Sequence, residues 1–244
     1  MKSKPILIAA GEPNSIFLEI FFKTIKLKKI KSPIILISSE KILKKQMKKL
    51  KFKKKIKLLN SNNFFEQKLD NKSINLLNVN FDQNKPFEKI SSKSNKFIKD
   101  SFKVAFKILK TGKIKKFING PISKKNFLNK KYFGVTEYLA KEFSIKKKAM
   151  LIYNKKLSVC PITTHLPIKF VSRKITKEKI LEKVQLINEF YQIHLKKKPR
   201  IAIIGLNPHC ESIDIFNEDD KIIKPTIKIL RKKFLVSGPY SADT

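Results

Sequence analysis

Short apolar runs alternate along the chain with stretches whose apolar residues recur at helical spacing. Residues 5–10 (PILIAA) form an apolar run that ends at Gly11, and residues 14–27 then carry apolar residues every three or four positions. The same succession returns with an apolar run at 33–37 and a lysine-rich amphipathic stretch at 39–50. This pattern predicts a buried strand, a turn and a helix, and then a second strand and helix.

The rest of the chain continues the alternation after one poorly patterned region. Residues 58–96 are rich in asparagine and predict a single strand at 74–79, whereas residues 91–110 predict a strong amphipathic helix. The remaining expected elements are strands at 114–118, 149–153, 157–163, 200–206 and 234–237, and helices at 136–143, 176–196 and 219–233. Such an order predicts an α/β fold whose sheet is mostly parallel and covered by helices.

Length and composition indicate an ordinary globular protein. A chain of 244 residues is long enough for one large or two modest domains, and 41% hydrophobic with 31% charged residues fits neither disorder nor a membrane-embedded chain. No run approaches the roughly 18 uncharged apolar residues of a membrane span, and the N-terminus MKSKPILIAAGEP lacks the apolar region of a signal peptide. The two cysteines, Cys160 and Cys210, cannot form a disulfide framework. We therefore expect a soluble, cytoplasmic protein.

The formal net charge of +37 is the unusual feature of the composition, and it first suggests a nucleic-acid partner. Only three of the 56 basic residues are arginine, however, although arginine is the residue that binds phosphates and guanine edges in a bidentate way. Lysine, isoleucine, asparagine and phenylalanine are abundant while glycine numbers six, a bias typical of AT-rich codon usage. We therefore interpret the charge as compositional drift and expect no nucleic-acid partner.

Histidine is scarce, and two of the three histidines occupy similar positions. His165 (PITTHLP) and His209 (IGLNPHC) each follow a predicted strand and have a proline nearby, whereas His194 lies within a predicted helix. Ligands of α/β proteins gather beyond the carboxyl ends of strands, and two imidazoles there could share one divalent cation. By spacing alone, two unrelated loop histidines are an equal alternative. Catalytic metal sites usually have three protein ligands, so this pair by itself is short of one.

Common cofactor and nucleophile motifs are absent. The chain has no G-x-G-x-x-G dinucleotide loop, no G-x-x-x-x-G-K-[ST] phosphate loop and no G-x-S-x-G nucleophile elbow. A nucleotide cofactor would need another kind of site.

Five of the six glycines stand in distinctive turns, and the turns form a recognisable series. Together with the TTH sequence they make six motifs in this order: GEPNSIFLE, GPISK, GVTEYLA, TTHLPI, GLNPHCES and GPYSADT. This ordered set resembles the 4-hydroxythreonine-4-phosphate dehydrogenase family, the NAD-dependent enzymes of pyridoxal phosphate biosynthesis. The resemblance runs along nearly the whole chain and is strongest in its second half.

The resemblance implies a fold, an assembly and a domain division. The fold would be the two-lobed isocitrate/isopropylmalate dehydrogenase-like α/β fold, with the active site in a cleft between lobes and completed across a homodimer. NAD would bind without a Rossmann glycine loop. We expect a first lobe at residues 1–118, a second lobe with the metal histidines at 119–236, and the start of a return to the first lobe at 237–244.

The resemblance also implies a reaction and the residues that serve it. The enzyme would oxidise the C3 hydroxyl of 4-phosphooxy-L-threonine with NAD, giving 2-amino-3-oxo-4-phosphooxybutanoate, which loses CO2 to form 3-amino-2-oxopropyl phosphate for pyridoxine 5'-phosphate synthesis. His165 and His209 match metal ligands for Zn, Co or Mg, and Thr136 matches a substrate-binding threonine. Lys124 and Asp243 match motifs that line the catalytic cleft, and we take them as candidate catalytic residues.

Departures from the family pattern leave alternatives open. Val135 stands where the family has a substrate-contacting histidine, so a dehydrogenase of phospho-erythronate or phospho-threonate is a second hypothesis. The sequence ends at Thr244, before the family's third metal histidine, so we expect a chain truncated at its C-terminus. A catalytically inactive basic relative is the third hypothesis.

Overall fold

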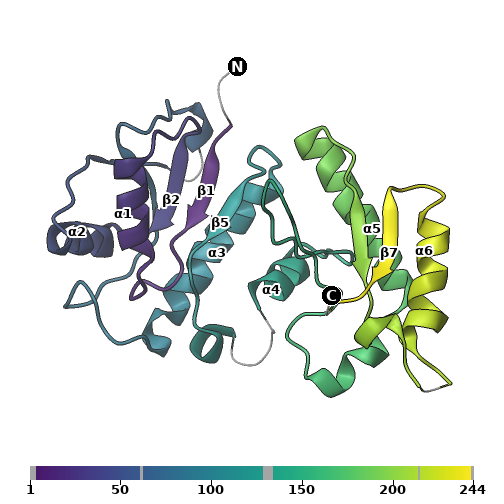
Figure 1. Ribbon diagram of the computed structural model, residues 1–244. Helices are drawn as coiled ribbons and strands as arrows, with labels where there is room; N and C mark the ends of the chain where they lie inside the picture. The colour runs from purple at the N-terminus through teal and green to yellow at the C-terminus, as the bar shows by residue number, and fades with distance from the viewer. Residues whose placement is uncertain (1–3, 61–62, 129–133, 214, 243–244) are drawn as a thin grey trace. The chain divides into compact units, whose positions relative to one another are not determined.

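The structure, a computed structural model, describes residues 4–60, 63–128, 134–213 and 215–242 (Figure 1). The chain divides into two compact units, unit 1 at Met1–Gly134 and unit 2 at Val135–Thr244. Each unit has its own sheet and helices. The expected division into a first lobe at 1–118, a second lobe at 119–236 and a return at 237–244 stays a prediction.

Unit 1 is built on a five-stranded, fully parallel sheet in the order β3-β4-β2-β1-β5. Its strands are β1 (Ile6–Ala9), β2 (Ile34–Ser38), β3 (Ile56–Leu58), β4 (Ile74–Asn78) and β5 (Phe117–Asn119). Every residue of β2 is buried, which explains why this strand reads as an unbroken apolar run rather than an alternating one. The register places Ile8 beside both Leu36 and Ile118.

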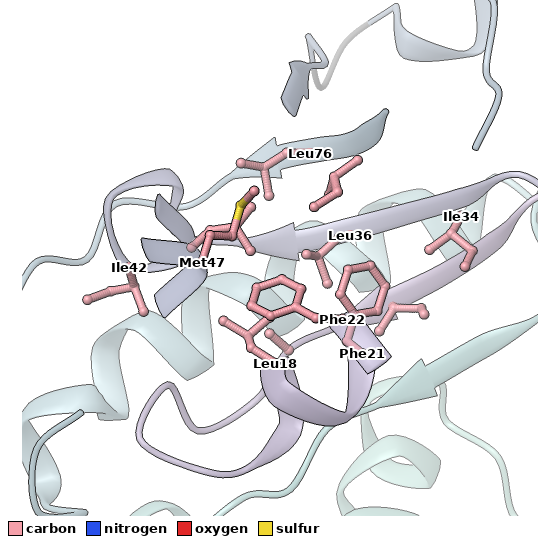
Figure 2. Packing of buried hydrophobic residues seen from close by; sticks show 12 residues of the cluster. Leu18, Phe21, Phe22, Ile34, Leu36, Ile42, Met47 and Leu76 are labelled. Carbon is pink, nitrogen blue, oxygen red and sulfur yellow. The ribbon is translucent and has the colours of Figure 1, made fainter. Parts of the chain in front are cut away.

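Two amphipathic helices, α1 (Phe17–Leu27) and α2 (Glu40–Lys49), pack on one face of this sheet. Figure 2 shows the resulting core, in which α1 and α2 side chains meet strand side chains. The labelled members are Leu18, Phe21, Phe22, Ile34, Leu36, Ile42, Met47 and Leu76. The lysines of α2 are exposed for the most part, as the amphipathic pattern predicts, and its start is capped by Ser39, whose hydroxyl accepts a hydrogen bond from Ile42 N at 3.4 Å.

The third long helix, α3 (Asn95–Lys110), covers the opposite face of the sheet. Its Phe102 ring contacts Phe117 of β5, and Phe117 is in register with Leu7 of β1. Leu7 points away from the face that α1 and α2 cover, because neighbouring residues of a strand alternate between faces. Single 3-10 turns, η1 (Phe64–Glu66) and η2 (Ser92–Ser94), and a π-helical turn, η3 (Lys124–Leu128), complete the unit.

Unit 2 holds a short parallel sheet of β6 (Ile201–Ile204) and β7 (Val236–Tyr240). Its helices are α4 (Val135–Glu142), α5 (Lys177–Phe190) and α6 (Lys224–Leu230). Two π-helical turns, η6 (Tyr191–Leu195) and η8 (Asp219–Ile223), adjoin α5 and α6, and 3-10 turns lie at η4 (Ile168–Phe170), η5 (Ser172–Lys174) and η7 (Pro208–Cys210). The core of this unit consists of Ile175, Ile180, Val184, Ile223, Ile227, Leu230 and Val236.

The predicted fold class, α/β with a mostly parallel sheet, is confirmed, but some element predictions are wrong. The predicted strands 149–153 and 157–163 form only an isolated antiparallel bridge between Ile152 and Val159. Both residues are exposed, and a lone two-stranded ribbon without a covered apolar face is unstable in water. The short strand β3 was not predicted, and β5 begins later than the predicted 114–118. No helix among the described residues is long and apolar enough to span a membrane.

Candidate functional site

The loops that follow β1 and β5 meet at the carboxyl edge of the unit 1 sheet. The backbone nitrogen of Glu12 donates a hydrogen bond of 2.7 Å to Pro121 O, and Gly120 N donates one of 2.7 Å to Ala9 O. A Cβ atom at Gly11 would lie 2.4 Å from Pro121 O, and one at Gly120 would lie 2.0 Å from Ala10 O. The glycines of the GEPNS and GPISK motifs are therefore required by the close approach of two backbones.

Glu12 is a buried carboxylate at this edge that the sequence analysis did not single out. Its Oε2 accepts a hydrogen bond of 2.6 Å from Ser94 Oγ, and its Oε1 accepts one of 3.2 Å from Asn14 N. Ser94 directly precedes α3, so the carboxylate ties the end of β1 to the start of that helix. An acidic residue directly after the glycine that ends a buried strand is the sequence signal that could have found it.

Lys124, a candidate catalytic residue, lies in the π-helical turn η3 a few residues beyond β5. The turn is held near α3 by a hydrogen bond of 2.8 Å from Asn95 Nδ2 to Asn126 O. A second bond of 3.1 Å runs from Asn126 N to Ser123 Oγ. The backbone of Lys124 thus belongs to the same edge of unit 1 as Gly11, Glu12 and Gly120.

Thr136, the candidate substrate-binding residue, lies in the first turn of α4 in unit 2 and is exposed. Val135 begins the helix and is half-buried. In the neighbouring Glu137, the Oε2 atom is buried and accepts no hydrogen bond from the part of the chain that the structure describes. Of these three residues, Thr136 alone is exposed.

His165 lies in an irregular loop of unit 2 rather than at the end of a strand. The predicted strand before it is wrong, since the nearest β pairing is the bridge at Val159. Its side chain is exposed, and its backbone has a φ of 55°. A left-handed conformation is uncommon outside glycine and is maintained only where the surrounding structure enforces it.

His209 follows β6, as predicted, in the 3-10 turn η7. It is also exposed and also has a left-handed backbone, with a φ of 56°. The two candidate metal ligands therefore share unit 2, exposure and a constrained backbone, and their convergence on one cation stays a prediction. His194 lies elsewhere, in η6, with its ring 5.2 Å from that of Phe190.

The residues present fit a metal ion in donor type but not in number. Imidazole nitrogens are ordinary ligands of Zn and Co, whereas Mg prefers oxygen. Among the described residues, no group of three His, Cys, Asp or Glu side chains is placed to hold a metal ion. Asp243, the other candidate catalytic residue, lies outside the described residues.

Burial shifts the pKa of two titratable groups of unit 2, the Cys160 thiol and the Lys179 amine. Burial raises the pKa of the Cys160 thiol, with Lys183 acting in the opposite direction. Burial also lowers the pKa of Lys179, and the neighbouring charges of Lys174 and Lys183 lower it further. A thiol with a raised pKa is a poor nucleophile near neutral pH, so Cys160 is not a candidate for covalent chemistry.

Comparisons with known proteins give the family of the chain. Residues 29–244 match the family described as "Pyridoxal phosphate biosynthetic protein PdxA". The 4-hydroxythreonine-4-phosphate dehydrogenase of Sulfurihydrogenibium sp. (strain YO3AOP1) is 37% identical over 245 residues, which cover 98% of this chain and 74% of that protein. A protein of Oceanobacillus iheyensis named "Putative D-threonate 4-phosphate dehydrogenase" is 26% identical over 259 residues, covering 100% of this chain and 76% of that protein.

A solved structure shares the fold. The crystal structure of 4-hydroxythreonine-4-phosphate dehydrogenase from Klebsiella pneumoniae matches with a TM-score of 0.82 at 22% identity, over 99% of this chain and 76% of that one. The family match covers most of the sequence, and the Sulfurihydrogenibium relative aligns with nearly all of it. This chain therefore belongs to the PdxA family of pyridoxal phosphate biosynthetic proteins.

Proposed function

We propose that the chain is a 4-hydroxythreonine-4-phosphate dehydrogenase of pyridoxal phosphate biosynthesis. The observation that carries the proposal is the 37% identity, over 98% of the chain, to a relative of that name. The six motifs support it, because two of them, at Gly11 and Gly120, meet at the carboxyl edge of a parallel sheet, where α/β enzymes bind their ligands.

The proposed reaction is an alcohol oxidation with NAD as the oxidant. A base would take the proton from the C3 hydroxyl of 4-phosphooxy-L-threonine, and NAD, when bound, would supply the oxidant that accepts the hydrogen of C3 with its electron pair. The ketone product is a β-keto acid, which loses CO2 to give 3-amino-2-oxopropyl phosphate. Lys124 and Asp243 are our candidates for the groups that move the proton, because a lysine or a carboxylate serves as a general base when its pKa suits the working pH.

Substrate and metal binding are assigned to unit 2. Thr136 is exposed at the start of α4, where its hydroxyl can donate to or accept from a substrate oxygen. His165 and His209 are our candidate ligands for a divalent cation. When bound, such a cation would polarise the substrate hydroxyl.

A phospho-threonate or phospho-erythronate dehydrogenase is the second candidate function, and two observations favour it. The Oceanobacillus relative aligns along 100% of the chain, although at 26% identity. Val135 also cannot form the hydrogen bond that a histidine at this position would give. Both functions oxidise a phosphorylated hydroxy acid with the same nucleotide, so they differ in the substrate contact and not in the chemistry.

A homodimer is the third part of the proposal, and an exposed apolar surface of unit 2 supports it. We call this surface the Tyr153 patch, and it comprises Ile152, Tyr153, Leu157, Val159, Phe190 and Ile193, all exposed. Ile152 pairs with Val159, and the Tyr153 ring lies 6.3 Å from that of Phe190. Large exposed apolar patches are typical of interfaces between proteins.

The test is a substrate panel assayed for NADH formation. 4-Phosphooxy-L-threonine, phospho-D-threonate and phospho-erythronate are each supplied with NAD and with Zn, Co or Mg. We expect turnover that requires metal, is strongest with 4-phosphooxy-L-threonine, and is reduced at least 100-fold by His209→Gln but not by the control His194→Gln. Turnover only with phospho-threonate would establish the second function, and NADH formation from none of the three would refute both.

A further inference from the structure

Asp219 is a fully buried carboxylate whose oxygens bind the loop that carries His209. Its Oδ1 accepts a hydrogen bond of 3.0 Å from Leu206 N, and its Oδ2 accepts one of 2.9 Å from Asn207 N. The Asn207 side chain adds a third bond, from Nδ2 to Asp219 Oδ2 at 3.0 Å. Hydrogen bonds to an ionised acceptor are shorter and roughly twice as strong as neutral ones.

The loop gains further restraints from its own backbone. Gly205 N donates to Tyr240 O at 2.9 Å, and Cys210 N donates to Asn207 O at 3.0 Å. His209 and Cys210 both have left-handed backbones, with φ of 56° and 60°. Two successive non-glycine residues of this kind persist only where neighbouring contacts over-determine them.

The space around Asp219 is closed as well as polar. A Cβ atom at Gly205 would lie 2.5 Å from Cys210 Sγ and 2.8 Å from Asp219 Oδ1. Cys210 is buried, whereas its neighbour His209 is exposed. The loop therefore closes on a buried thiol and a buried carboxylate, and it directs the imidazole outward.

We propose that Asp219 is the positioning residue for His209. It binds the two backbone amides at the start of the loop, and the enforced turn that follows then sets the direction of the imidazole. This inference rests on the proposed function only for the use of His209 as a metal ligand. The effect of Asp219 on the loop itself is independent of that function.

The decisive variant is Asp219→Asn, which keeps the shape of the side chain. An amide has one acceptor oxygen, so its NH2 group would face a backbone N–H, and two donors would oppose each other. The matched control is Asp220→Asn, because the neighbouring Asp220 is bound to Lys224 and Asn217 rather than to the loop. Ile227→Val, in the core of unit 2, is the control for a general loss of stability.

The readout is imidazole NMR of histidine-labelled chain, which has only three histidines. In Asp219→Asn without metal we expect the His209 signal to move or broaden, the His194 signal to stay, and the Leu206 and Asn207 amides to exchange at least about 10-fold faster. Titration with Zn or Co should show an affinity about 10- to 100-fold weaker, the usual effect of losing a group that orients a metal ligand. Both controls should leave the His209 signal and the metal affinity as in the parent, and Ile227→Val measures how much faster the amides exchange through a loss of stability alone.

An unchanged His209 signal with unchanged amide exchange would overturn the inference. If Asp219→Asn does not fold, Asn207→Ala decides, because it keeps the backbone bond to Asp219 and removes the side-chain bonds of Asn207 Nδ2 to Asp219 and Glu218. It should produce the same changes at smaller size. An Asn207→Ala variant identical to the parent would then refute the proposal. Absence of NADH formation by the parent would refute the proposed function and leave these loop measurements valid.

Discussion

The backbone nitrogen of Glu12 donates a hydrogen bond of 2.7 Å to the carbonyl oxygen of Pro121. The bond joins the loops that follow β1 and β5, two neighbouring strands of the unit 1 sheet. It brings the GEPNS and GPISK motifs together, although most of unit 1 separates them in sequence. Their meeting point lies at the carboxyl edge of a parallel sheet, where α/β proteins bind ligands.

Gly120→Ala should destabilise unit 1 by at least about 3 kcal/mol, because its Cβ would lie 2.0 Å from a backbone oxygen that cannot move away. Thermal and urea unfolding measure the loss. Gly112→Ala is the control, since Gly112 also lies in a turn but has nothing within 4 Å of its Cβ position. Its positive φ should cost only about 1 kcal/mol. Equal losses in the two variants would contradict the close approach of the Gly120 and Ala10 backbones.

Phe22→Ala should lower the free energy of unfolding by about 3–5 kcal/mol, because the ring is buried in the core shown in Figure 2 and stacks on Phe52 at 4.6 Å. Leu27→Ala on the same helix is the comparison, since 74% of that side chain is exposed. It should change stability by less than about 0.5 kcal/mol. A loss of similar size in both would mean that α1 packs by another face.

Asp82 should make folding stability depend on pH in the acid range. Hydrogen bonds from Lys45 and Lys41 lower its pKa from 3.8 to about 2. A carboxyl whose folded-state pKa is depressed stabilises the folded state above its ordinary pKa, and this stabilisation is lost as the pH falls from about 4 towards 2. Carboxyl NMR should show the depressed pKa directly, and Lys45→Gln should raise it. A parent pKa near 3.8 would contradict the ion pairs.

Val135→His should improve the use of 4-phosphooxy-L-threonine. A histidine at the start of α4, next to Thr136, would add one polar contact that valine cannot make. We expect kcat/KM to rise about 10-fold for that substrate, the value of one net hydrogen bond, and to change less for phospho-threonate. Val135→Leu is the control for side-chain bulk. A rise for both substrates alike would show that the position does not select between them.

Ile193→Glu should convert the proposed dimer to a monomer. A charge placed in the Tyr153 patch would lose its hydration on association, which is costly without a partner of opposite sign. Sedimentation of the parent should show a dimer that this variant disrupts. Leu27→Glu, at an exposed position in unit 1, should leave the dimer intact. A monomeric parent would refute the assembly.

Local patterning was enough to predict most elements of this protein. The buried run Ile34–Ser38 and the amphipathic helix Asn95–Lys110 were both indicated by sequence, because hydrophobic spacing reports which faces of an element are covered. The family could also be identified from the sequence, because the glycines and histidines of the six motifs keep their order along the chain.

Pairings between distant residues could be decided only by the tertiary structure. Whether residues 149–163 become strands depends on a neighbouring strand and a covered face, and the structure supplies only the Ile152–Val159 bridge. Spacing gave no sign that Glu12 would bind Ser94, or that Asp219 would bind the amides of the His209 loop. A carboxylate looks the same in sequence whether it is solvated or buried, and only packing brings the N–H and O–H donors that make its burial favourable.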